Sequence, residues 1–470
     1  MPGDPPPLDP VATRQAIDYY EGWLAFQQPY LRVPGVQAAV LLEGEVLLST
    51  AYGLADVERG VELTPRHLFR IASHSKTFTA TAILQLAEQG ALRLDDTAGS
   101  WVPYLAEQGS PLAAVTLREL LSHSSGVYRD SADGDFWQLR RPFPDRFGLE
   151  QILLDPDAPV LARNERFKYS NIGYGLLGLV LEAASGTSYA EQLRRSVIDP
   201  LGLRDTGPER DHGRADDHAV AYTALSYAES RVPIDDLDTG ALAPATGFYS
   251  TASDLVTYFS AHFLGDERLL GDDAKRQMQL GVWDAGDDGE RYALGLGTQT
   301  VGARKLIGHD GGFPGHITCS VADPTAKLAV SVLTNAMDGP AQPLAHAAVR
   351  ILDLACDDRA RAGDKADDAD LRRFTGRFAS LTGVTDVALL GGRLFLLSAA
   401  APDPVEGAIE LDVVDEHTLR MTGDKGFGSY GEPVRYRFAA DGTVESLRAS
   451  SGMTLTPLAR FTLPDRVSLA

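Results

Sequence analysis

The sequence predicts an α/β (α+β) fold in which an antiparallel sheet is flanked by helices, with a helical subdomain, followed by a small C-terminal β-barrel. Three observations predict this arrangement. Short apolar runs beside Gly or Pro turns, typical of β-hairpins, occur at residues 38–48 and again at 305–333. Mostly helical periodicity fills residues 69–270 between them. Beyond residue 370, short strands recur at regular spacing with Gly turns.

The elements of the first part follow one another as helix, hairpin, helical insertion, strands and helix. Residues 10–30 have the periodicity of an amphipathic helix, with these expected buried positions: Ile17, Trp23, Leu24 and Phe26. The runs 38–42 and 46–48 predict a hairpin around Glu43-Gly44-Glu45. After the helical insertion we expect strands at 305–308, 317–321 and 328–333 and a helix at 342–355.

Three segments divide the chain. Residues 1–356 are expected to form the first domain, and residues 357–370 are polar, charged and without apolar periodicity, which indicates a linker. Residues 371–470 are expected to form the barrel, with strands at 387–390, 394–397, 410–414, 418–421, 434–438 and 444–447.

Composition excludes several classes of protein. The 470 residues include 65 acidic and 43 basic side chains, a net charge of -22, so nucleic acid and anionic membranes are not expected partners. No signal peptide or apolar run of about 20 residues is visible, which indicates a cytoplasmic protein, although a trimmed secreted one would look the same. Cys319 and Cys356 are interpreted as packing residues, and we expect no metal and no cofactor.

Ser73 and Lys76 form the strongest local feature, at the start of a helix expected to end near Gln89. Three residues make almost one helical turn, so the two side chains can meet. An amine there could accept the serine proton or stabilise its alkoxide, and a helix N-terminus favours developing negative charge. An N-capping serine with a solvated lysine would give the same fragment, so the pattern alone leaves both interpretations open.

A second segment, Tyr169-Ser170-Asn171, precedes an apolar helix expected at residues 172–184. A tyrosine beside a lysine ammonium can have its pKa lowered and act as a general base. Asn171 could donate to a substrate carbonyl or orient Lys76. Alone, the segment would be interpreted as a loop-to-helix junction with a packed tyrosine.

A third segment runs from Gly308 to Gly315 (Gly-His-Asp-Gly-Gly-Phe-Pro-Gly) between two expected strands. Glycines there would let a substrate approach the backbone and would free an N–H group for an oxyanion. A flexible turn with a structural His309 is the alternative.

In this order, Ser-x-x-Lys, Tyr-x-Asn and His-x-Gly resemble the three active-site motifs of the serine β-lactamase and penicillin-binding protein superfamily. The Tyr-x-Asn form is similar to the class C branch, which includes D-aminopeptidases, D,D-carboxypeptidases and esterases. Four flanking signatures extend the resemblance over most of residues 10–355: Tyr-Gly-Leu-Ala-Asp at 52–56, Leu-Leu-Ser-His-Ser-Ser-Gly at 120–126, Pro-Leu-Gly-Leu at 200–203 and Gly-Phe-Tyr-Ser-Thr-Ala-Ser-Asp-Leu at 247–255. Residues 374–378 (Phe-Thr-Gly-Arg-Phe) resemble the lipocalin-like barrel appended to some members.

The resemblance implies a serine hydrolase domain over residues 1–356 and a role for each motif residue. Ser73 would attack an acyl carbon to form an acyl-enzyme, which water then hydrolyses. Lys76 and Tyr169 would handle the proton, with either as the base. The remaining residues would bind: Asn171, His309 and Gly311 the substrate, and the N–H groups of Ser73 and Gly312 the oxyanion. His123 is expected to have a structural, hydrogen-bonded role.

The third motif departs from the lactamase pattern, which usually begins with Lys. His309 is largely neutral near pH 7 and Asp310 adds negative charge, so binding of a substrate carboxylate is weakened. We therefore expect a peptidase, aminopeptidase-type or esterase activity on small amides or esters. Asp130, Asp133 and Asp310 are candidate partners for a substrate ammonium.

Two alternatives remain open: a β-lactamase or D-Ala-D-Ala carboxypeptidase, and a catalytically silent member that binds peptidoglycan fragments or a protein. The expected partner is a small-molecule or short peptide substrate, and a homo-oligomer is compatible with the sequence.

Overall fold

The computed structural model describes residues 5–286, 289–357, 368–422, 429–449, 452–463, 465 and 467. The chain forms two compact units, Val33–Ala345 and Met1–Arg32 with His346–Ala470. The expected domain boundary at residue 356 and the linker at 357–370 stay predictions, because residues 358–367 lie outside the described part. In the division into units, the N-terminal helix groups with the barrel.

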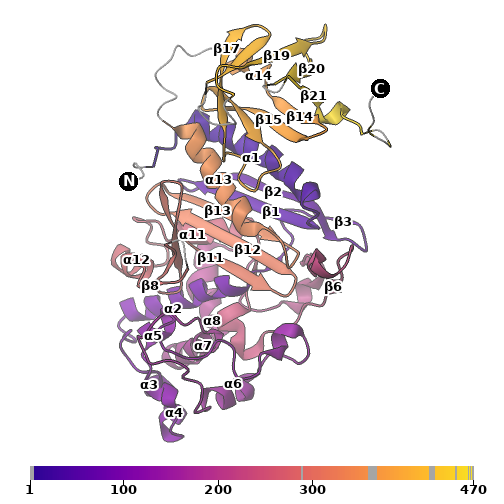
Figure 1. Ribbon diagram of the computed structural model, residues 1–470. Coiled ribbons are helices and arrows are strands. Elements are labelled where there is room, and N and C mark those ends of the chain that lie inside the picture. Colours follow the sequence, from indigo (N-terminus) through magenta and orange to yellow (C-terminus); the bar gives the residue numbers. More distant parts are fainter. Residues whose placement is uncertain are drawn as a thin grey trace. The chain divides into compact units, whose positions relative to one another are not determined.

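An antiparallel sheet forms the centre of the first unit (Figure 1). Its order over the described residues is β3-β2-β1-β13-β12-β11-β10-β9-β8. The strands are β1 (Gly35–Leu42), β2 (Glu45–Asp56), β3 (Val61–Glu62), β8 (Trp283–Asp284), β9 (Arg291–Tyr292), β10 (Gly297–Val301), β11 (Arg304–Phe313), β12 (His316–Asp323) and β13 (Leu328–Thr334). The expected hairpin and the three later strands are confirmed; β8, β9 and β10 were not expected.

Strand β11 is longer than the strand expected at residues 305–308, and the flexible turn given as the alternative for the third motif is not observed over residues 309–313. Strand β11 continues through His309 to Phe313, because every residue from Ile307 onward pairs with β12. The turn is restricted to Pro314-Gly315, where Gly315 has φ 84° and an added Cβ would lie 2.4 Å from Ala221 Cβ. The His-x-Gly part of the third motif therefore belongs to a paired strand.

Helices pack against this sheet and form the helical subdomain seen below it in Figure 1. Helix α11 (Ala252–Ser260) packs on β1 and β13, and α2 (Ser75–Glu88) packs on α7 (Asn171–Ser185) and α10 (Ala243–Thr246). Helix α2 is buried on nearly all sides, and its buried polar side chains, such as Thr79 and Thr81, are hydrogen-bonded. The shorter helices are α3 (Ala98–Trp101), α4 (Pro103–Glu107), α5 (Leu117–Leu121), α6 (Arg146–Leu153), α8 (Tyr189–Leu193), α9 (Asp199–Leu201) and α12 (Asp272–Gln279).

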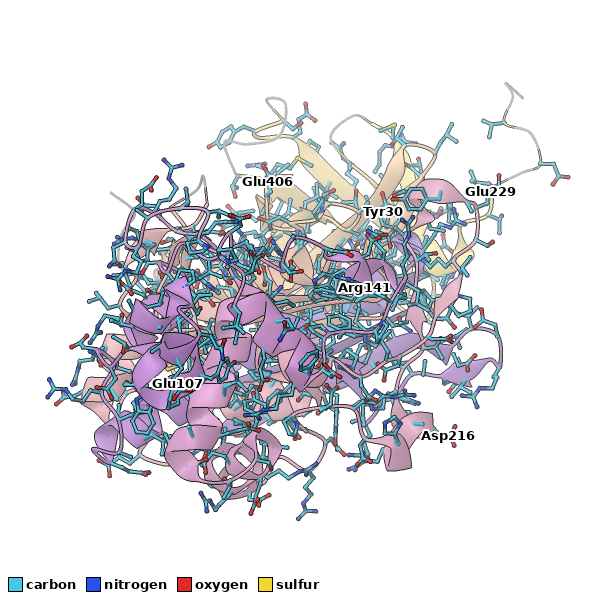
Figure 2. All side chains as sticks on the ribbon, turned by 90° about the horizontal axis from the view of Figure 1, so that it is seen from below. Tyr30, Glu107, Arg141, Asp216, Glu229 and Glu406 are labelled. Atoms are coloured by element: carbon cyan, nitrogen blue, oxygen red, sulfur yellow. The ribbon has the colours of Figure 1, made fainter. Side chains whose placement is uncertain are left out.

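Polar side chains cover the outside of the first unit, as Glu107 and Asp216 illustrate in Figure 2. Over the described residues, none of the helices combines the length and the apolar character that crossing a membrane requires.

The second unit is a closed β-barrel with a helix packed on it. Its strands are β14 (Gly376–Ser380), β15 (Gly383–Leu390), β16 (Arg393–Ser398), β17 (Ile409–Asp415), β18 (Thr418–Met421), β19 (Pro433–Phe438), β20 (Val444–Arg448) and β21 (Thr454–Pro457). The six expected strands are confirmed, and β14 and β21 complete the closure. Helix α14 (Asp368–Arg372) precedes the barrel, and α13 (Ala341–Cys356) contains the boundary between the units.

Helix α1 (Pro10–Tyr30) confirms the expected helix, and Asp9 caps it by accepting from two backbone N–H groups. Its buried side faces the barrel: Nε1 of Trp23 donates to the Ala399 carbonyl at 2.9 Å, and Nε2 of Gln27 donates to the same oxygen at 2.7 Å. Of the expected buried positions, all but Phe26 are buried. Phe26 is half-exposed, and the Arg377 guanidinium carbon lies 4.5 Å from the centroid of its ring.

Candidate active site

Ser73 lies on a tight turn between strand and helix. Strand β4 (Phe69–Arg70) leads into the 3₁₀ turn η1 (Ala72–His74), so Ser73 precedes α2 instead of lying in its first turn. Ala72 has φ 47°, a left-handed conformation that costs an L-residue about 1 kcal/mol. The turn is held by Nδ1 of His74, which donates to the Ile71 carbonyl at 3.0 Å, and by the Ser75 hydroxyl, which donates to the Ala72 carbonyl at 2.5 Å.

Three of the expected residues meet at one oxygen atom. The Tyr169 hydroxyl donates to Ser73 Oγ at 2.8 Å, and Lys76 Nζ lies 3.2 Å from the same atom. Lys76 Nζ also donates to the Ala245 carbonyl at 2.8 Å, which fixes the amine against α10. A nucleophile between two proton-transfer groups at hydrogen-bond distance is the arrangement that covalent catalysis requires.

Burial determines the protonation of this cluster. Lys76 is fully buried, and desolvation lowers its pKa well below the usual value, with Arg129 lowering it further and Asp130 opposing the shift. Burial raises the pKa of Tyr169, so the lowered tyrosine pKa expected from sequence is absent. The physical reason is that burial disfavours a tyrosinate more than the hydrogen bond to Ser73 and the charge of Arg129 favour it. A lowered pKa makes the Lys76 amine easier to deprotonate, and a deprotonated amine could accept the Ser73 proton.

Asn171 is the first residue of α7, after the N-cap Ser170, whose hydroxyl accepts from the Gly173 N–H at 2.9 Å. Asn171 Nδ2 donates to Asp130 Oδ1 at 2.6 Å. The amide oxygen of Asn171 is buried without a partner in the described structure. Asp130 also accepts from Trp137 Nε1 at 2.9 Å and pairs with Arg129 at 3.3 Å. The Asp130 carboxylate is therefore already engaged, and of the three candidates for a substrate ammonium it is the least available.

Two-residue turns determine which backbone groups of β11 face outward. The hairpins close at the pairs Val301/Arg304 and Phe313/His316. The two residues that flank such a turn exchange both backbone hydrogen bonds with each other. Along the strand, successive residues then direct their N–H and C=O groups alternately toward this partner strand and away from it. From either turn the result is the same: Gly312 directs its N–H away from β12. Since β10 begins at Gly297, opposite Gly308, this part of β11 has an open edge, and the Gly312 N–H is a candidate oxyanion donor.

Gly311 has a different position from the one expected. A Cβ atom there would lie 2.3 Å from the Ile71 carbonyl oxygen and 2.3 Å from Thr318 Oγ1. The side of Gly311 that a side chain would occupy therefore packs against the backbone that leads to Ser73. A Cβ at Gly312 would meet only Ile317 Cδ1, at 3.7 Å.

Both ring nitrogens of His309 are engaged. Nδ1 donates to the Asp310 carbonyl at 2.7 Å, and Nε2 lies 3.0 Å from the Tyr292 hydroxyl. Burial, with Lys76 and His74 nearby, lowers the pKa of His309 to about 3, so the ring is neutral at physiological pH. Tyr292 was missed in the sequence, since it belongs to a two-residue strand and to no motif.

His123 has the structural environment expected for it. Its Nδ1 accepts from the Ser170 N–H at 3.1 Å, and its ring lies 4.3 Å from that of Tyr169 and 4.7 Å from that of Tyr292. Burial also lowers its pKa well below the usual value.

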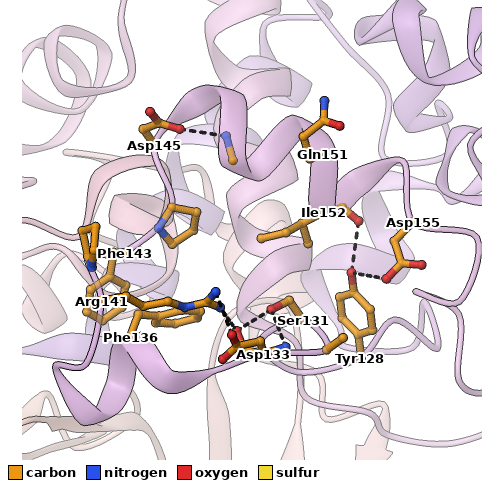
Figure 3. Close-up of a pocket in the computed structure, with 14 residues that line it drawn as sticks. Tyr128, Ser131, Asp133, Phe136, Arg141, Phe143, Asp145, Gln151, Ile152 and Asp155 are labelled. Carbon is orange, nitrogen blue, oxygen red and sulfur yellow. Dashed lines mark hydrogen bonds and ion pairs between the residues drawn. The ribbon is translucent and has the colours of Figure 1, made fainter.

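Two described pockets lie near this region. A pocket of about 170 Å³ is lined partly by Tyr292 and His309 and so adjoins the cluster. A larger one of about 770 Å³ is lined by residues between positions 128 and 155 and does not include Ser73. Figure 3 shows the second pocket, with the Tyr128 hydroxyl donating to Asp155 and Arg141 paired with Asp133 at 2.8 Å. Asp133 is thus already paired with a cation.

Comparisons with known proteins agree with this geometry. The Beta-lactamase family model matches residues 25–354. Penicillin-binding protein 4* of Bacillus subtilis is 28% identical over 59% of this chain and 63% of its own length. Protein flp of Staphylococcus aureus is 29% identical over 40% of this chain and 38% of its own length. The chain thus spans less than two thirds of these relatives.

Solved structures give the same result. An octameric penicillin-binding protein homologue from Pyrococcus abyssi has a TM-score of 0.64 at 23% identity and covers 94% of this chain and 100% of its own, which shows a shared fold. A D-stereospecific amidohydrolase from Streptomyces sp. has a TM-score of 0.57 at 25% identity, covering 70% and 95%. The chain therefore belongs to the Beta-lactamase family, within the serine β-lactamase and penicillin-binding protein superfamily.

Proposed function

We propose that this protein hydrolyses small amides or esters through an acyl-enzyme on Ser73, with an aminopeptidase-type or esterase activity. The observation that carries the proposal is the convergence of Lys76 Nζ and the Tyr169 hydroxyl on Ser73 Oγ, at 3.2 and 2.8 Å. A binding module has no need of a buried amine at a serine oxygen, because burying an amine costs free energy, and buried groups with shifted pKa values are concentrated at functional sites.

In this mechanism Ser73 Oγ forms a bond to the acyl carbon while its proton passes to the neutral Lys76 amine. The carbonyl electron pair moves to oxygen, where the N–H groups of Ser73 and Gly312 would stabilise it. Collapse breaks the bond to the leaving group, which takes a proton through Tyr169 from the Lys76 ammonium. Water then attacks the acyl-enzyme, with the same groups removing its proton and returning one to Ser73 Oγ.

A neutral third motif favours neutral or cationic substrates over anionic ones. His309 holds no charge that could bind a carboxylate, and the protein as a whole carries a net charge of -22. Among related folds, the D-stereospecific amidohydrolase from Streptomyces sp. supports a preference for acyl groups derived from D-amino acids. A β-lactamase or carboxypeptidase would be expected to bind a substrate carboxylate, and for that reason ranks second.

The test is the Ser73→Ala variant with a panel of p-nitrophenyl esters, D- and L-aminoacyl amides, acyl-D-Ala-D-Ala and nitrocefin. Turnover should fall by about 10⁴-fold or more, and mass spectrometry should detect an acyl adduct in wild type only. Ser100→Ala, at an exposed serine of α3, is the matched control and should retain full activity. Unchanged turnover by Ser73→Ala would remove Ser73 from the mechanism, and fast nitrocefin hydrolysis without amide hydrolysis would favour the β-lactamase alternative.

A further inference from the structure

The hydrogen bonds of His309 determine where its protons are. Nδ1 lies 2.7 Å from the Asp310 carbonyl oxygen, which can only accept, so Nδ1 carries a hydrogen. A neutral imidazole has one hydrogen, which leaves Nε2 with a lone pair. The Tyr292 hydroxyl, 3.0 Å from Nε2, is then the donor of that bond.

We propose that Tyr292 is a positioning residue that donates its hydroxyl proton to Nε2 of His309 and so holds the imidazole as the neutral Nδ1–H tautomer. In this form the ring has no free N–H, no free lone pair and no charge, so it cannot bind a substrate carboxylate. Tyr292 is therefore the residue that makes the third motif selective for substrates without a carboxylate near the scissile bond. This statement about selectivity rests on the proposed function, whereas the tautomer does not.

The surroundings of His309 also favour the neutral ring. The His74 ring lies 6.2 Å away between centroids, and burial of the His309 ring, the largest cause of its lowered pKa, opposes a positive charge on it. The Asp310 carboxylate accepts instead from Gln342 Nε2, at 3.2 Å. No neighbouring carboxylate is hydrogen-bonded to His309 in the described structure, and the bond to the Asp310 carbonyl, which favours an imidazolium, is outweighed by burial of the ring.

Tyr292 has one competing acceptor. The Tyr174 hydroxyl uses its own proton to donate to the Leu121 carbonyl at 2.8 Å, and its oxygen is close enough to accept a hydrogen bond from the Tyr292 hydroxyl. If Tyr292 donated there, Nε2 of His309 would have to be protonated to bond the Tyr292 oxygen. With Nδ1–H retained, this would require an imidazolium beside Lys76. The two arrangements differ in an observable, the protonation of Nε2.

The direct test is nitrogen NMR of the full chain labelled with ¹⁵N in its histidine rings, with the His309 signals assigned by their loss in His309→Gln. Between pH 5 and 8, Nδ1 should be protonated and Nε2 unprotonated with no titration. In Tyr292→Phe, Nε2 loses the bond that stabilises its lone pair, so the His309 pKa should rise. Tyr227→Phe, at a tyrosine 89% exposed, is the matched control and should leave the spectrum unchanged. A protonated Nε2 in wild type would overturn the proposal.

Selectivity is tested with two esters that differ by one charge, para-acetoxybenzoate and its methyl ester. Wild type should prefer the neutral ester in kcat/KM by about tenfold or more at pH 5 and pH 8, which corresponds to about 1.4 kcal/mol. In Tyr292→Phe the preference should narrow at pH 5, where His309 can take a second proton, and remain at pH 8. A preference that is unchanged at pH 5 would overturn the selectivity role. If wild type cleaved neither ester, the esterase part of the proposed function would fail while the tautomer result would stand.

Discussion

Gly311→Ala tests whether the close packing of the third motif against the Ile71 backbone holds Ser73 in place. The new Cβ would lie 2.3 Å from the Ile71 carbonyl oxygen and from Thr318 Oγ1, whereas ordinary contacts begin at 3.4 Å, so each oxygen would have to move by about 1 Å. Overpacking of this kind costs about 1–3 kcal/mol, and we expect about 3 because one of the two atoms belongs to the backbone. Ile71 lies two residues before Ser73, and a misplacement of about 1 Å can cost about 10²-fold in rate.

The assay is urea unfolding followed by tryptophan fluorescence, together with kcat/KM on a p-nitrophenyl ester. Gly312→Ala is the matched control for stability, because its Cβ would meet only Ile317 Cδ1 at 3.7 Å, and its free energy of unfolding should change by less than about 0.5 kcal/mol. Gly311→Ala with the urea midpoint and activity of wild type would refute the reasoning.

Three further predictions concern the base, metals and the barrel. Because burial lowers the Lys76 pKa, kcat/KM should rise with pH through a value well below 10.5 and then remain level, as a pH profile would reveal; an acid limb near pH 10 would contradict a neutral amine. Activity should survive dialysis against EDTA, and a loss that zinc restores would contradict a metal-independent mechanism. Trp23→Ala should cost about 3–5 kcal/mol in unfolding of the barrel unit, because its fully buried ring and its bond to Ala399 are lost, while Val11→Ala at an exposed position should cost little.

The local pattern of the chain predicted much of the fold. Helix α1, the β1–β2 hairpin and six barrel strands follow from periodicity and turn residues, which act over a few positions. The grouping of α1 with the barrel could not be predicted, because Trp23 and Ala399 are joined by a hydrogen bond between positions 376 apart in sequence. Strand β11 was shortened in the prediction because glycines read as turn residues, whereas pairing with β12 extends the strand through them.

The sequence motifs predicted which side chains meet at the candidate site, whereas the burial of those side chains and their pKa shifts could not be predicted from the motifs. Ser73, Lys76 and Tyr169 come together as expected, since each belongs to a local signature. The raised pKa of Tyr169 depends on burial by segments distant in sequence. Tyr292 belongs to no signature and reaches His309 only because β9 and β11 flank the same strand, β10.

Position 309 links substrate charge to the strength of the base. A lysine there would provide a cation for a substrate carboxylate and, by repulsion, would lower the Lys76 pKa further. A neutral His309 has neither effect. With histidine at this position the site has no cation there to bind an anionic substrate, and the Lys76 pKa is lowered less than it would be by a lysine. Arg129 and Asp130 have opposite effects on the Lys76 pKa, and burial is the largest cause of its shift. Exchanging lysine for histidine in the third motif can therefore change which substrates bind without removing the neutral amine beside Ser73.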